Sequence, residues 1–157
     1  MATIIATPTN RFLELMPEYL AGNKTFEDIV EFKVGEGGWV SEAGGVVPRT
    51  PDPTLEDLDA IENPTRYPSD SVATFTKAPS SLTVVGSTLE IECVLDMGEF
   101  NDDGFGNFPE IYEIGVYTLD PDNASLRILV AYGTFAKQTK NPAVSLTNTV
   151  KITFGVG

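Results

Sequence analysis

From residue 72 to the end of the chain, apolar and polar residues alternate in short runs, the pattern of half-buried β-strands. The runs are rich in β-branched and aromatic residues, and turn residues such as Gly86-Ser87 and Asp120-Pro121-Asp122-Asn123 separate them. The expected strands are Val72–Thr76, Leu82–Val85, Leu89–Asp96, Ile111–Thr118, Leu126–Phe135 and Leu146–Phe154. This half of the chain predicts an antiparallel β-sheet or sandwich.

The N-terminal part has a different period. Large apolar residues recur at helical spacing over residues 7–22, and Gly22 follows as a stop signal, so we expect a helix there. Pro17 removes a backbone donor, which predicts a kink or two short helical pieces. A strand is expected from Phe26 to Val34. The predicted class is α+β, with the N-terminal helix packed on the sheet, in a single domain over residues 1–157.

Residues 35–71 form a long excursion that is rich in glycine and proline. Inside it, Thr54 and Asp57 have the spacing of a capping box, which predicts one short helix over residues 54–62. Loops of this length are usually functional or ordered against a partner. We therefore expect residues 39–70 to be mobile in the free protein and ordered by a partner.

Charge and composition exclude several function classes. The chain has 157 residues and a net charge of −13, so we expect no nucleic-acid binding and no binding to anionic membranes. No apolar run is long enough for a spanning helix, so no membrane insertion is expected. The chain contains no histidine, and no catalytic spacing is evident, so an enzyme is not expected. Its one cysteine, Cys93, is expected to be a buried small hydrophobe.

Glu113 is the most informative polar residue, because it interrupts the apolar run from Ile111 to Tyr117. A carboxylate among large apolar residues is costly unless it is paired. We interpret it as a buried acid that accepts backbone N–H bonds from the glycine-rich turn near Gly35; the alternative is a half-exposed residue on the polar face. Trp39, at the start of the excursion, is either a lid on the core or an interface anchor.

The segment from Asp96 to Gly104 carries many oxygen ligands that could suit calcium. Its spacing does not match an EF-hand loop, so a solvated loop is favoured and no metal or other cofactor is expected. The glycines at positions 35, 37 and 38 lack the following helix start and Lys-Ser/Thr pair of a phosphate-binding loop.

Several motifs, in order, resemble the N-terminal domain of the phage tail-collar fibre family. After the expected helix come Val34-Gly35-Glu36-Gly37, then Arg66-Tyr67 at the end of the excursion, then Glu113-Ile114-Gly115 in the sheet. The resemblance implies a structural role for Gly35, Gly37, Trp39, Arg66, Tyr67, Glu113, Ile114 and Gly115, as an interface or as a structural motif. It also implies a component of the virion, assembled in the host cytoplasm.

In that family the domain normally begins a long fibre and attaches it to the baseplate, whereas this sequence ends at Gly157 without a shaft. The resemblance therefore implies a baseplate or tail-fibre protein, or an adaptor, of a phage tail or a related contractile particle. Its partners would be baseplate or tail-fibre proteins. The chain would form a homo-oligomer, as a trimer or as copies arranged on a ring.

The alternative function is a carbohydrate-binding β-sandwich module of a receptor-binding protein. Such a module would stack sugars on exposed aromatic side chains, for which Trp39, Phe100, Phe105 and Phe108 are candidates.

Overall fold

The computed structural model describes residues 2–25, 27–63 and 73–154. The fold is mostly β, with 52% of residues in strands and 10% in helices, so the predicted α+β class is wrong. The reason is the small extent of the helical pattern. In the described ranges it produces one helix of eleven residues and a second of four, and the sheets form the body of the molecule.

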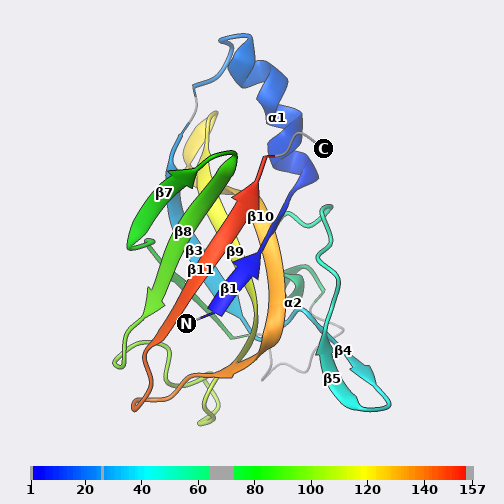
Figure 1. Ribbon diagram of the computed structural model, residues 1–157, viewed down its shortest axis with the longest axis vertical. Helices are drawn as coiled ribbons and strands as arrows, with labels where there is room; N and C mark the ends of the chain where they lie inside the picture. Colours follow the sequence, from blue (N-terminus) through cyan, green and yellow to red (C-terminus); the bar gives the residue numbers. More distant parts are fainter. Residues whose placement is uncertain (1, 26, 64–72, 155–157) are drawn as a thin grey trace.

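Two sheets face each other as a β-sandwich (Figure 1). The four-stranded sheet has the order β1 (Ala2–Ile5), β11 (Leu146–Thr153), β8 (Thr88–Leu95) and β7 (Ser81–Val85). The five-stranded sheet has the order β2 (Thr7–Pro8), β10 (Asn123–Thr139), β9 (Glu110–Asp120), β3 (Ile29–Gly35) and β6 (Thr74–Lys77).

The expected strands of the C-terminal half correspond to β6 through β11, with shifted ends, and the strand expected before Gly35 corresponds to β3. Two short strands, β1 and β2, were not expected. β1 runs parallel to β11, so the expectation of a purely antiparallel arrangement is wrong. The pairing joins segments that are more than a hundred residues apart, and local periodicity carries no signal for such a contact.

The N-terminal helix α1 spans Asn10–Leu20, shorter than expected because residues 7 and 8 belong to β2. Thr9 is its N-cap, and the Thr9 hydroxyl accepts a hydrogen bond from the N–H of Phe12 at 3.3 Å. Pro17 lies inside one continuous helix, so the expected division into two pieces is wrong. Leu15 and Tyr19 are buried together with a residue of β10, and this packing holds the helix despite the missing donor.

The core lies between the two sheets. Side chains from both inner faces form one apolar cluster, which consists of Ile4, Ala6, Phe32, Val34, Ile91, Cys93, Leu95, Ile111, Ile114, Val116, Val130, Ala131, Val150 and Ile152. Cys93 is buried in this cluster as expected, and burial raises the pKa of its thiol to about 12. Cys93 therefore behaves as a small core hydrophobe.

The excursion covers the outer face of the five-stranded sheet. It contains the hairpin β4 (Trp39–Glu42) and β5 (Gly45–Pro48), and then the short helix α2 (Asp59–Glu62). Leu55 and Leu58 of the excursion form a buried cluster with Tyr117, Leu129 and Tyr132 of the sheet. β9 is therefore buried on both faces along most of its length.

These contacts bear on the expectations for the excursion. Leu55, Leu58 and Asp59 are buried against the protein's own sheet, whereas residues 41–46 of the hairpin are exposed. The mobility of the segment in the free protein stays a prediction. The capping box is not formed, because the Asp57 carboxylate accepts from the side chains of Lys33 and Tyr117. The helix begins at Asp59, not at residue 54.

Candidate functional site

The alternation of side chains along β9 places Glu113 beneath the excursion. Ile114 and Val116 point into the core between the sheets, whereas Tyr117 packs in the cluster beneath the excursion. Successive side chains of a strand point to opposite faces, so Glu113, Gly115 and Tyr117 all face the excursion. Glu113 is fully buried there, at 0% exposure.

Among the residues that the structure describes, four groups donate hydrogen bonds to the Glu113 carboxylate. Oε1 accepts from the backbone N–H of Gly37 at 3.1 Å and of Ala60 at 3.3 Å. Oε2 accepts from the backbone N–H of Asp59 at 2.9 Å and from the hydroxyl of Tyr132 at 2.6 Å. The interpretation of Glu113 as a buried acid bonded to the glycine-rich turn is confirmed. The side chain also satisfies N–H groups in the first turn of α2, which has no side-chain N-cap of its own.

Gly35 and Gly37 have no side chain, and this lets the backbone of the excursion lie close to Glu113. A Cβ on Gly35 would lie 2.8 Å from Oε1 of Glu113, and one on Gly37 would lie 2.5 Å from the backbone nitrogen of Ala60. A Cβ on Gly115 would lie 2.7 Å from Cδ1 of Leu129. The structure thus brings Gly35 and Gly37 to Glu113, whereas Gly115 packs against Leu129 and Tyr117 and Ile114 lies on the other face, in the core.

Further contacts around Glu113 had no local sequence signal. The Asp57 carboxylate accepts from the Tyr117 hydroxyl at 2.6 Å and from the Lys33 ammonium at 2.9 Å. Asp59 forms an ion pair with Arg49, 2.6 Å between Oδ2 and Nη1, and its side chain is only 1% exposed. These pairs join residues of the excursion to one another and to β3 and β9. We refer to Glu113 and its four donors (Gly37, Asp59, Ala60 and Tyr132), together with Asp57, as the glutamate lock.

Burial raises the pKa of Glu113 to about 7, although the hydrogen bonds from Tyr132, Ala60 and Asp59 act in the opposite direction. A folded-state pKa above the ordinary value of 4.5 means that the folded protein binds this proton more tightly than the unfolded chain. The stabilisation from this linkage is fully present below about pH 4.5 and is lost as the pH rises through about 7.

The expected result is that mild acid stabilises the protein. Between about pH 8 and pH 6, the free energy of unfolding should rise by about 1 kcal/mol through Glu113. Urea denaturation across this range measures the slope, and the Glu113→Gln variant, which has no proton to bind, should give a flatter profile. If the free energy of unfolding depends on pH as steeply in Glu113→Gln as in the parent, another titratable group causes the stabilisation.

Glu36 is a second carboxylate with a pKa raised to about 7 by burial. Its Oε1 accepts from the backbone N–H of Glu110 at 2.8 Å, and its backbone oxygen accepts from Nε1 of Trp39 at 2.7 Å. The Trp39 ring is half-buried and lies 6.2 Å from the ring of Tyr112. Trp39 therefore packs on its own domain with one part exposed. Arg66 and Tyr67 lie outside the described residues.

The oxygen-rich loop is organised by a lysine. Lys140 is fully buried, and its ammonium donates to the Asn101 side chain at 2.7 Å, to the Asn141 carbonyl at 3.1 Å and to the Met97 carbonyl at 3.4 Å. Burial lowers the pKa of Lys140. In the described ranges, no three His, Cys, Asp or Glu side chains are grouped so that they could hold a metal ion. Two oxygens of this segment, the Asn101 side-chain oxygen and the Met97 carbonyl, are thus bound to an ammonium of the chain.

Replacing Lys140 with methionine should lower the free energy of unfolding by about 1–2 kcal/mol, because the loop carbonyls and Asn101 lose their charged donor. Lys137→Met is the control, since Lys137 is exposed and pairs with Glu110 at the surface; it should change stability by less than about 0.5 kcal/mol. Thermal denaturation with and without EDTA should give the same midpoint. A lower midpoint after chelation would contradict this account and support a calcium site.

Comparison of the chain with models of protein families, with curated proteins and with solved structures finds no match. The resemblance to the tail-collar domain thus rests on the motifs alone. Among the described residues, no helix is both long and apolar enough to cross a lipid bilayer.

The four aromatic side chains proposed for sugar stacking do not share one environment. Phe100 stacks on Phe75 with 5.6 Å between ring centroids, and Trp39 packs on Tyr112. Phe105 and Phe108 are more than half exposed, at 61% and 55%. Two of the four candidates are therefore held by neighbouring rings of the domain.

Proposed function

We propose that the protein is a structural component of a phage tail or a phage-tail-like contractile particle, acting as a baseplate or tail-fibre protein or as an adaptor between the two. The observation that carries this proposal is the glutamate lock. It joins Glu113-Ile114-Gly115 to the glycine-rich segment Gly35–Gly37, two of the motifs whose order carries the resemblance to the tail-collar domain.

The chemistry of the lock supports a structural use of the carboxylate. All four hydrogen-bond donors of Glu113 belong to the protein's own fold, and three of them are backbone N–H groups. A general acid or base must be able to reach a substrate proton, and a fully buried carboxylate with four internal partners is poorly suited to that role. Its effect is to fix the excursion on the sheet, which gives the domain a defined outer surface for assembly.

The proposal is tested on particles from a strain that carries the gene. Tail particles are purified from the parent, from an in-frame deletion and from the deletion complemented with the intact gene. Mass spectrometry should find the chain in the parent and complemented particles, and electron microscopy should show deletion particles that lack fibres or fail to assemble. Fully assembled, fibre-bearing particles from the deletion, with no trace of the chain in the parent, would contradict the proposal.

A carbohydrate-binding module remains the rival function. Its test is a glycan array with the purified protein, in which saturable binding that Phe105→Ala or Phe108→Ala abolishes would favour the rival. These two side chains are the exposed members of the aromatic set.

A further inference from the structure

Strand β7 leaves one edge of the four-stranded sheet open. It is the last strand of that sheet, and all five of its residues are exposed. Hydrogen bonds alternate sides along an antiparallel strand, so half of the backbone N–H and C=O groups of β7 face away from β8. Proteins usually protect such an edge with a charged residue, a proline or a bulge, and Ser-Leu-Thr-Val-Val contains no charge and no proline.

The inner face of β7 is also uncovered. Leu82 and Val84 pair in register with Ile91 and Leu89, so they lie on the face that turns toward the core. They are nevertheless 42% and 74% exposed. The sandwich is therefore not closed along this edge, where two apolar side chains that point inward lack a covering layer.

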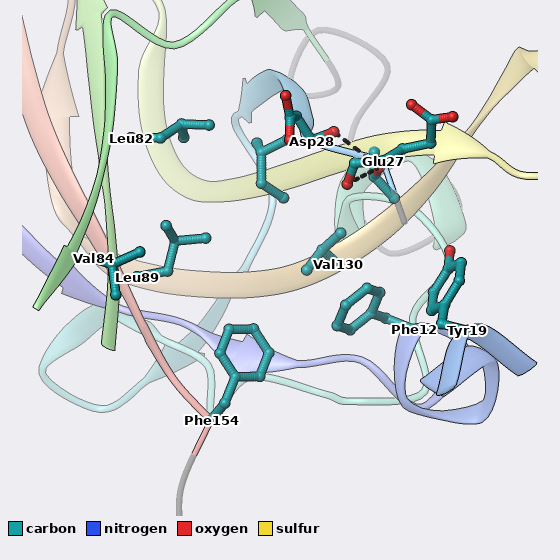
Figure 2. Close-up of a pocket in the computed structure, with 11 residues that line it drawn as sticks. Phe12, Tyr19, Glu27, Asp28, Leu82, Val84, Leu89, Val130 and Phe154 are labelled. Atoms are coloured by element: carbon teal, nitrogen blue, oxygen red, sulfur yellow. Dashed lines mark hydrogen bonds between the residues drawn. The ribbon is translucent and has the colours of Figure 1, made fainter. Parts of the chain in front are cut away.

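An apolar cavity of about 320 Å³ opens beside these side chains. Figure 2 shows Leu82, Val84 and Leu89 along one side of it, with Phe12 and Phe154 across from them. The cavity continues the inner face of β7 into the space between the four-stranded sheet and α1. A strand that paired with β7 could insert alternate side chains into this space.

Two acidic residues lie at the edge of the cavity. Glu27 and Asp28 line it and are exposed, and their backbone carbonyls accept hydrogen bonds from the Thr118 hydroxyl at 3.2 Å and 2.9 Å. These bonds fix the backbone at the rim. Within the described part of the chain, neither carboxylate has a basic partner. The groove thus combines apolar walls with two exposed acidic residues at its edge.

We propose that β7 binds an extended segment of a partner protein as an additional strand, with alternate apolar side chains in the groove and a lysine or arginine at Glu27 and Asp28. Strand addition uses backbone groups for affinity and alternate side-chain pockets for selectivity. A second copy of this chain fits less well, because it also carries a net charge of −13 and its β7 has no basic residue. This inference does not depend on the proposed function.

The probe is the synthetic peptide Lys-Val-Thr-Val-Thr-Val-Lys, whose valines alternate and whose ends are basic. Two comparison peptides carry Glu at both ends or place the three valines side by side. Binding is measured by calorimetry with the full chain, and hydrogen exchange follows the amides of Leu82 and Val84. We expect the alternating, Lys-ended peptide to bind most tightly and to protect these amides.

Two matched variants separate the inner face of β7 from its outer face. Val84→Glu places a charge in the groove, whereas Val85→Glu places it on the opposite face; both sites are more than half exposed, at 74% and 55%, so both variants should fold. We expect Val84→Glu to weaken binding at least about tenfold and Val85→Glu to change it less than about twofold. The double variant Glu27→Gln/Asp28→Asn should remove the preference for the Lys-ended peptide over the Glu-ended one.

Four outcomes overturn the proposal. They are no binding at millimolar peptide, equal effects of Val84→Glu and Val85→Glu, equal binding of the peptide with adjacent valines, and binding without protection of the β7 amides. Sedimentation of the free protein supplies a further test. A dimer that Val84→Glu dissociates would show that a second copy occupies this edge, which also contradicts a foreign strand.

Discussion

Replacing Glu113 with alanine is expected to lower the free energy of unfolding by about 3 kcal/mol. The change leaves the buried N–H groups of Gly37, Asp59 and Ala60 without their acceptor, and an unsatisfied buried donor costs about 1–3 kcal/mol. It also removes the partner of the Tyr132 hydroxyl and opens a cavity beneath the excursion. Urea denaturation monitored by tryptophan fluorescence measures the loss, since Trp39 lies in the excursion.

Two other variants serve as comparisons for Glu113→Ala. Glu113→Gln should cost less than alanine, because the amide oxygen still accepts hydrogen bonds on one side. Glu90→Ala removes a carboxylate from the surface ion pair with Lys151 and should stay within about half a kcal/mol of the parent. If Glu113→Ala proves as stable as Glu90→Ala, the structural role assigned to the glutamate lock is wrong.

The second large effect is expected from Gly37→Ala, which should lower the free energy of unfolding by about 2–3 kcal/mol. The added Cβ would meet three atoms of Ala60, two of them backbone, at 2.5–2.8 Å. Backbone atoms cannot move aside as a flexible side chain can, so α2 must shift and the hydrogen bonds to Glu113 must lengthen. Denaturation measures the stability, and hydrogen exchange at the Ala60 amide reports the displaced helix.

Gly44→Ala is the matched control. Gly44 is exposed in the β4–β5 hairpin, its φ is not in the left-handed region, and a Cβ there would have no heavy atom within 4 Å. The control should be neutral or slightly stabilising. Equal losses in Gly37→Ala and Gly44→Ala would mean that the close approach of the excursion to Glu113 does not constrain the fold.

Several strands of the C-terminal half were predictable because they bury one face, so that apolar and polar residues alternate along them, and because turn residues separate them. Thr88–Leu95 is an example, with Ile91, Cys93 and Leu95 buried and the residues between them partly exposed. The class prediction is wrong because the helical periodicity over residues 7–22 corresponds to one helix of only eleven residues, while the two sheets bury most of the core. The hairpin β4–β5 was missed because its strands lie among glycines and prolines, which usually interrupt strands.

The candidate site was predictable only in part. A carboxylate in an apolar run must be paired, and the glycine-rich segment near Gly35 offers backbone N–H groups that no side chain shields, so the bond between Glu113 and Gly37 could be expected. The N–H groups of Asp59 and Ala60 could not, because their position depends on how Leu55 and Leu58 pack on the sheet. Tertiary packing decided which donors reach the carboxylate.

The pairing of β1 with β11 also affects how the protein can be synthesised. β1 is made well before its neighbour in the sheet, β11, which spans Leu146–Thr153. The hairpin of β7 and β8 can form as soon as both strands leave the ribosome, but the four-stranded sheet must wait until β11 has also left it. Until then Ile4, a core residue of the folded protein, stays exposed on the nascent chain, where chaperones can bind it.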